Sequence, residues 1–252
     1  IMIKKTFTLL FSLFLLFLLK VEPIKAQAAI DLESGLVITG YNDVRIPGDQ
    51  GTFFSLKDDL IPDPKIFVRL RVNYTIKSRH TISLLYAPLK TISEGSISGP
   101  VTFEGVVFPE NTELTGNYKF NSYRLTYRYK IVQRPKFEFG VGFTAKIRDA
   151  YIELKSSDLV SVKTNVGFVP IINFRLMWQP GDAFGILFEG DALAAPQGRA
   201  EDVIAAATYK ISDKLTLKAG YRLLEGGADN DEVYSFAMFH YATAGLIFTF
   251  GK

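Results

Sequence analysis

The chain has 252 residues and no cysteine, 22% of its residues are charged, and its formal net charge is +3 at pH 7. Without cysteine it can hold no disulfide framework, thiolate metal site, cysteine nucleophile or lipidated cysteine. The whole net charge lies in the first 28 residues, so the remainder is formally neutral. The basic isoelectric point therefore does not indicate nucleic-acid binding.

Residues 1–28 have the features of a secretory signal peptide. Lys4 and Lys5 give a positive start, an apolar run covers 6–19, and Ala26-Gln27-Ala28 has the small-x-small pattern of a cleavage site. The alternative is an N-terminal membrane anchor, but the apolar run is shorter than the roughly 20 residues of a spanning helix. We expect an exported protein whose signal peptide is removed.

The domain that follows, 29–252, alternates apolar and polar residues in ten segments. The expected strands are 33–42, 65–76, 79–91, 117–131, 136–149, 165–178, 183–193, 202–211, 214–225 and 235–250. In the clearest one, Tyr123, Leu125, Tyr127 and Tyr129 alternate with Arg124, Thr126, Arg128 and Lys130. Segments of this length exceed ordinary soluble strands and suit tilted strands that cross a bilayer.

The connections between these segments alternate between very short and long. Tight turns are expected at 77–78, 132–135, 179–182 and 212–213, and longer loops at 43–64, 92–116, 150–164, 194–201 and 226–234; the first, second and last of these loops are acidic. This alternation is typical of membrane barrels with tight periplasmic turns and longer external loops. We predict an all-β fold, a transmembrane antiparallel up-and-down β-barrel of about ten strands, with eight as the alternative count.

The last expected strand ends in Leu246-Ile-Phe-Thr-Phe250. With this ending, the signal peptide and the alternation, the chain resembles small outer-membrane β-barrel proteins of Gram-negative bacteria over about residues 30–252. The resemblance implies a monomer in the outer membrane of the cell envelope, in contact with lipid and lipopolysaccharide. It also implies insertion by the barrel-assembly machinery, which recognises an aromatic-terminated last strand. Gly251-Lys252 departs from that signal. We expect no cofactor and no nucleic-acid partner.

Charged side chains are expected to face the inside of the barrel. The candidate lumen network comprises Arg69, Arg71, Arg124, Arg128, Arg175, Arg222, Glu138, Glu189 and Asp191; Lys146, Arg148 and Lys218 are expected on the same face. A ten-stranded barrel is only slightly wider than one filled by side chains, and unpaired buried charge is costly. We therefore expect an ion-pair plug. Because bases outnumber acids, a narrow anion-preferring passage is the alternative.

His240 is the one histidine that could carry chemistry. The stretch Phe239-His-Tyr-Ala-Thr-Ala-Gly245 resembles the His-x-Ser strand motif of the outer-membrane lipid A 3-O-deacylases, which implies a general base and a serine nucleophile. Ala242 stands where that serine would be, so the nucleophile is missing. Omptin-type proteases combine an Asp pair with an Asp–His pair; Asp58-Asp59 offers the first, but no Asp-x-His occurs. We identify no catalytic residue.

Two external features remain. We interpret 188–202 and 221–234 as loops that pack over the mouth as a lid, with Arg199 meeting Glu225 or Asp229. The acidic stretches Asp58-Asp59 and Asp229-Asn-Asp-Glu232 carry oxygen ligands of the kind Ca²⁺ prefers, but lack the spacing of a defined metal loop. We expect solvated loop charge there and assign no metal site.

The sequence thus predicts a barrel with a non-enzymatic structural or surface-binding role, or a narrow porin-like solute channel. The alternative function is an outer-membrane enzyme that acts on lipid or lipopolysaccharide, as a deacylase does. A soluble lipocalin-like barrel is the third reading. It is disfavoured because the expected outward face is too aromatic and the inward face too charged.

Overall fold

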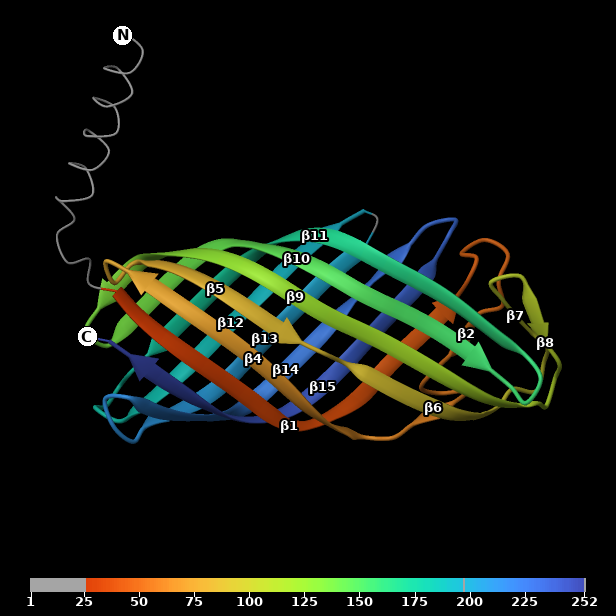
Figure 1. The fold of residues 1–252 in the computed structure, drawn as a ribbon, viewed down its shortest axis with the longest axis horizontal. Helices are drawn as coiled ribbons and strands as arrows, with labels where there is room; N and C mark the ends of the chain where they lie inside the picture. The colour runs from red at the N-terminus through yellow and green to blue at the C-terminus, as the bar shows by residue number, and fades with distance from the viewer. Residues whose placement is uncertain (1–25, 197, 252) are drawn as a thin grey trace, which may run out of the picture.

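The computed structural model describes residues 26–196 and 198–251, which form a closed antiparallel β-barrel (Figure 1). The wall consists of β1 (Ala26–Arg45), β4 (Lys65–Ile76), β5 (His80–Ala87) with β6 (Lys90–Ser96), β9 (Glu113–Arg134), β10 (Phe137–Lys155), β11 (Val160–Trp178), β12 (Phe184–Ala195), β13 (Gly198–Lys210), β14 (Leu215–Asp229) and β15 (Tyr234–Phe250). Since β5 and β6 both pair with β9, they form one interrupted strand, and the wall has ten strands.

Three long ladders help to close the ring. β1 pairs with β15 on one side and with β4 on the other, and β9 pairs with β10, so the sheet has no free edge around most of its circumference. The start of β1 and the end of β15 lie at the same end of the barrel (Figure 1). We call this the terminal end. No helix in the described residues is long and apolar enough to cross a membrane.

The expected strands are confirmed, but three of the five expected long loops are wrong. Most of 150–164 belongs to β10 and β11, 194–201 is a tight hairpin between β12 and β13, and 226–234 is mostly strand. In 150–164 the alternating signal fails because the apolar residues are inward on β10, at Ile152 and Leu154, but outward on β11, at Val160 and Val162. The hydrogen-bond ladder nevertheless continues to Lys155–Val160 at the tip of the β10–β11 hairpin. The predicted signal peptide lies outside the described residues, except Ala26–Ala28, which begin β1.

An apolar band surrounds the outside of the barrel. On β9 it runs from Tyr123 to Ile131, and the outward residues within that stretch are all exposed. This is nine residues of strand, the length that a tilted strand needs to cross a bilayer. Beyond Tyr123 the outward face turns polar, since Lys119 forms an ion pair with Asp149 on β10 at 2.7 Å. β9, β10 and β11 therefore project well beyond the band.

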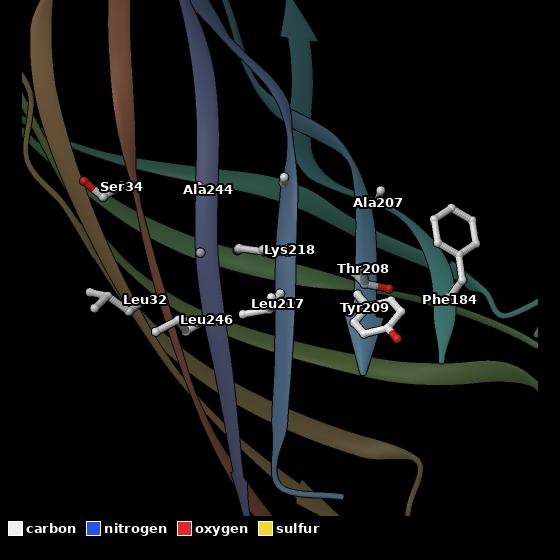
Figure 2. A pocket seen from close by; sticks show the side chains of 12 residues that line it. Leu32, Ser34, Phe184, Ala207, Thr208, Tyr209, Leu217, Lys218, Ala244 and Leu246 are labelled. Atoms are coloured by element: carbon white, nitrogen blue, oxygen red, sulfur yellow. The ribbon is translucent and has the colours of Figure 1, made fainter. Parts of the chain in front are cut away.

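The band is hollowed on one side, over β13, β14, β15 and β1. Figure 2 shows this hollow, about 700 Å³ in volume, where Ala207 and Ala244 lie between the larger Leu32, Leu217 and Tyr209. These large side chains are exposed, so the hollow belongs to the lipid-facing surface. It is a depression of the outer wall.

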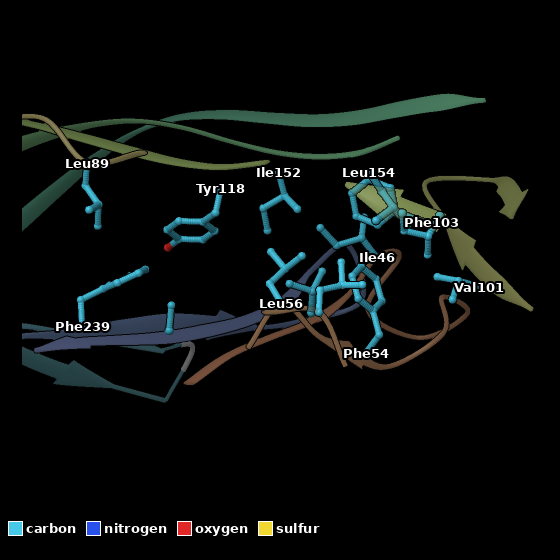
Figure 3. Close-up of a cluster of buried hydrophobic side chains, with 14 of the residues drawn as sticks. Ile46, Phe54, Leu56, Leu89, Val101, Phe103, Tyr118, Ile152, Leu154 and Phe239 are labelled. Carbon is cyan, nitrogen blue, oxygen red and sulfur yellow. The ribbon is translucent and has the colours of Figure 1, made fainter. Parts of the chain in front are cut away.

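The other two long connections fold over the far end of the barrel, which we call the capped end. They contain β2 (Phe54–Ser55) and β3 (Ile61–Pro62) in the first, and the hairpin of β7 (Val101–Phe103) and β8 (Val106–Phe108) in the second. The Phe54 and Phe103 rings pack together with centroids 6.1 Å apart, and they belong to one buried cluster whose other end is formed by Tyr118 and Phe239 (Figure 3).

The lumen at the capped end is therefore an apolar core. The cluster includes Ile46, Phe54, Leu56, Leu60, Val101, Phe103, Phe108, Leu154 and Phe239. We expected a polar lumen throughout, and for this section that expectation is wrong. The reason is that the two long connections supply their own apolar residues to fill the mouth, so the wall residues opposite them are apolar on the inward face too.

The cap gives a direct test of this packing. Phe54 is 1% exposed, whereas its neighbour Phe53 is 54% exposed. We expect Phe54→Ala to lower the free energy of unfolding by about 3–5 kcal/mol, since a large buried ring leaves a cavity. Urea unfolding in lipid vesicles, followed by gel mobility of the folded barrel, measures this. Phe53→Ala is the control and should cost far less; equal losses for both would contradict the inward packing.

Candidate functional site

Asp202 is the centre of a charged layer that crosses the middle of the lumen. It is 2% exposed and accepts hydrogen bonds from Arg69 Nη2 at 2.8 Å, Arg124 Nη2 at 2.6 Å and Arg222 Nη1 at 2.5 Å. These arginines come from β4, β9 and β14, so the single carboxylate on β13 connects opposite sides of the wall. Hydrogen bonds between ionised partners are about twice as strong as neutral ones.

Glu33 on β1 extends this layer. Arg222 donates to it in a bidentate manner, with Nε at 2.7 Å and Nη2 at 2.9 Å, and Lys218 Nζ donates at 2.8 Å. Strand alternation explains the arrangement, because Lys218 and Arg222 are an even number of residues apart on β14 and so share its inward face. The Glu33 carboxylate is fully desolvated, and each of its oxygens has a cationic partner.

A second group of acids lies on β12. Asp191 accepts from Arg124 Nη1 at 2.7 Å, and Thr144 and Asn173 donate to its other oxygen at 2.6 and 2.9 Å. Glu189 accepts from Arg175 Nε at 2.9 Å. Glu189 is also paired with Arg71, and Arg128 lies at 3.6 Å from it.

The charged layer leaves almost no open space. The cavity that remains among Arg69, Arg71, Glu189 and their neighbours has a volume of about 10 Å³. This is close to the smallest volume that holds one water molecule. On either side lie larger cavities, of about 460 Å³ at the terminal end and about 450 Å³ towards the capped end. The layer thus separates two vestibules.

The structure places all nine residues of the candidate lumen network on the inward side of the wall. Eight of them are paired within the layer or next to it, and Glu138 pairs instead with Lys130 at 2.7 Å in the terminal vestibule. Sequence reasoning missed the two central acids, Glu33 and Asp202. Both are the first residues of their expected strands, where the alternation is weakest. Counting back in steps of two from Val37 and Ile204 would have found them.

Arg199 and Glu225 meet, but not as a lid. Arg199 Nε donates to both carboxylate oxygens of Glu225, at 2.9 and 2.8 Å, and the Tyr41 hydroxyl donates to the same carboxylate. Both residues lie on paired strands, β13 and β14, so the interpretation of these segments as loops over the mouth is wrong. Asp229 is exposed at the end of β14, opposite Tyr234.

His240 lies on the outward face of β15, and its Nδ1 shares a hydrogen bond with the Tyr221 hydroxyl. Ala242 is exposed on the same face, while Thr243 is buried on the other. Asp59 accepts from the Ser55 backbone N–H at 2.7 Å and so stabilises a turn in the cap. Among residues 26–196 and 198–251, no three His, Cys, Asp or Glu side chains converge as a metal site would require.

No family model and no curated protein matches this sequence. Among solved structures, the outer membrane protease OmpT from Escherichia coli superposes with a TM-score of 0.56 at 10% identity, covering 92% of this chain and 99% of that one. The attachment invasion locus protein Ail of Yersinia pestis gives a TM-score of 0.41 at 10% identity, covering 90% and 99%. Neisserial surface protein A gives 0.35 at 12%, covering 91% and 100%. The fold is that of an outer-membrane β-barrel.

Asp202 allows a test of the layer. Asp202→Asn keeps the shape but leaves three buried arginines short of a carboxylate. We expect a loss of about 3–5 kcal/mol in the free energy of unfolding, as for other broken buried ion pairs. Equilibrium urea unfolding of the vesicle-inserted barrel, followed by fluorescence of the single tryptophan, measures this.

The adjacent Glu201→Gln is the matched control. Glu201 lies on the same strand with the opposite orientation, so its substitution should change stability by no more than about 0.5 kcal/mol. If Asp202→Asn behaved like Glu201→Gln, the shared carboxylate would not hold the layer together.

Proposed function

We propose that this protein is a non-conducting outer-membrane barrel whose role is to bind at its capped end. In this proposal residues 1–28 direct export and are removed, and the barrel-assembly machinery inserts the monomer. Lipid and lipopolysaccharide surround the apolar band, and the capped end faces outward. The role is non-enzymatic.

The observation that carries the proposal is the closed charged layer. Solute passage needs a continuous lumen, and the two vestibules are separated by side chains that leave only about 10 Å³. Opening a path would require Asp202 to leave three arginines or Glu33 to leave Arg222 and Lys218. Breaking buried pairs of this kind costs several kcal/mol each. This favours a plug over the narrow anion-preferring passage.

The outward location is supported by the band and the cap. The apolar exterior of Tyr123–Ile131 on β9 has the height of a bilayer, which favours a membrane over a soluble lipocalin-like protein. The capped end is ordered by its own core, so it presents a fixed surface rather than loose loops. A rigid surface loses less conformational entropy on binding a partner.

An enzyme finds less support. His240 faces outward and hydrogen-bonds only to Tyr221 among the described residues, with no carboxylate to orient it. The alanine at position 242 leaves no nucleophile in the deacylase arrangement. A proton-transfer role would need such partners within hydrogen-bond reach.

Single-channel conductance in planar bilayers tests the proposal. We expect the refolded protein to be silent while migrating as a folded, heat-modifiable barrel. The double variant Arg124→Ser with Asp202→Ser removes the bridge between β9 and β13, and it should give discrete, salt-dependent steps. Lys119→Ser with Asp149→Ser is the control, since this pair has the same charges but lies on the outer face, and it should stay silent.

Steady conductance steps from the native protein would overturn the plug and restore the channel. Silence of the double variant with an intact fold would show that the layer does not close the lumen by itself.

A further inference from the structure

The wall of the barrel is open on one side near the capped end. β11 and β12 pair only from Ile172 with Ala192 to Trp178 with Ile186. Beyond that point Val160–Ile171 pairs with β10 alone, and Leu193–Ala195 pairs with β13 alone, among the described strands. The two strands therefore diverge. Pro170 lies in the unpaired stretch, where a residue without an N–H is tolerated because no neighbouring strand needs it.

The gap leads into the vestibule that lies between the charged layer and the capped end. This cavity of about 450 Å³ is lined by inward residues such as Tyr118 and Phe239, but also by Phe168, which faces outward on β11. Phe168 is 68% exposed and lines a second hollow on the outer wall as well. Because Phe168 lies on the unpaired stretch of β11, it stands at the edge of a lateral opening. Inside, Lys163 pairs with Glu104 of the β7–β8 hairpin at 3.1 Å and bounds the gap at the top.

The gap lies partly at the level of the apolar band. Phe168 is the ladder partner of Ile147, which is itself the partner of Tyr123 at the upper edge of the band. The outward residues along the open edge, Ile172, Phe168 and Val166, are all exposed and apolar. A molecule in the outer part of the bilayer could reach the cavity without crossing the aqueous mouth.

The floor of the cavity carries uncompensated positive charge. Lys146 is 3% exposed, points inward from β10, and has no carboxylate within ion-pair distance among the described residues; its Nζ lies 4.6 Å from the Phe120 ring centroid. Arg148, two residues further, donates to the Asn165 side chain, and its Nε is buried without a partner. Buried charges are normally paired, so the buried Lys146 ammonium beside the half-buried Arg148 guanidinium indicates an anionic ligand.

Much of the remaining lining is apolar, and its charged residues include the Arg199–Glu225 ion pair, Lys163 and Glu232. Above Lys146 lie Tyr118, Ile152, Val169, Leu193, Leu224 and Phe239. A charged floor under an apolar wall fits an amphiphile, and a volume near the lower part of the range for small-molecule sites fits one chain rather than several.

We propose that this cavity binds a single-chain anionic amphiphile, headed by a carboxylate or a phosphate, which enters from the membrane through the gap between β11 and β12. The head group contacts Lys146 and Arg148, and the chain lies along Tyr118, Ile152 and Phe239 towards Phe168. The inference rests on the proposed membrane location and names the ligand class for the capped end.

Equilibrium binding of radiolabelled dodecanoate tests it, with the full barrel in nanodiscs of zwitterionic phosphatidylcholine and empty discs as background. We expect saturable binding of one molecule per barrel. Lys146→Met should weaken binding at least tenfold, and Lys146→Arg should restore it, because the charge returns. Lys155→Met, which removes an exposed lysine at the far end of the same strand and outside the cavity lining, is the matched control and should bind as the native protein does. Gel mobility shows whether each variant folds.

The head group is distinguished by a parallel titration with dodecyl phosphate, and tighter binding of one probe assigns the head. Dodecyltrimethylammonium should not compete. Equal binding of this cation, binding no greater than in empty discs, or an unchanged affinity of folded Lys146→Met would each overturn the site.

The route has its own test, since the chain has no cysteine. Val169→Cys with Leu193→Cys places one thiol on each side of the gap. Bridging them with a bifunctional thiosulfonate should slow dodecanoate uptake at least tenfold, and reduction should reverse this. Val169→Cys alone with the same reagent controls for its bulk. An unchanged uptake rate in the bridged protein would overturn the lateral route. If the native barrel is silent but binds no dodecanoate, the amphiphile site is refuted and the plug is not. If the native barrel conducts, the plug is refuted and the amphiphile site is not.

Discussion

A strand that crosses lipid must have every backbone N–H and C=O paired within the protein, and this requirement determines most of the structure. It closes the sheet into a ring and fixes each side chain as inward or outward. A shift of one residue in the register of a strand would therefore move its side chains to the wrong face. Where the apolar band ends, the requirement ends too. β11 loses its partner β12 close to that level, partly within the upper edge of the band, and the resulting free edge carries Lys163 and Pro170, residues that natural proteins use to protect exposed edges.

The charged layer follows from the same closure. Inward positions of a narrow barrel meet across its axis, so charges placed there must be satisfied by each other. Asp202 and Glu33 achieve this by sharing their oxygens among arginines and a lysine from three other strands. Lys146 does not join the network, although it lies close above it on β10. The layer around Asp202 and Glu33 has ion-pair partners for its charges and is therefore a structural element. Lys146 has no such partner among the described residues, and this makes its surroundings a candidate ligand site.

The strands and their facing could be predicted from the sequence because each lipid-facing segment alternates strongly, as Tyr123–Lys130 does. The ends of β10 and β11 could not, since the apolar face changes from inward on β10, at Ile152 and Leu154, to outward on β11, at Val160 and Val162. The apolar cap could not be predicted either, because Phe54 and Phe103 lie in segments without periodicity. The inward charged residues could be predicted from the alternation of inward and outward positions along each strand. Their ion-pair partners could not, since pairing across a lumen depends on strand tilt. The gap depends on which strands fail to pair, and a linear pattern does not contain that information.

The length of β9 has a consequence for the cell surface. Ten residues, Glu113 to Ser122, continue past the last aromatic of the band. At about 3.3 Å per residue this is roughly 30 Å of strand, shortened by its tilt. In the proposed orientation the wall would act as a rigid stalk that lifts the cap through the layer of head groups and the first sugars. Antibodies, phage or neighbouring cells would then contact folded β-structure of fixed shape. An amphiphile would contact the protein nearer the membrane, at the gap between β11 and β12.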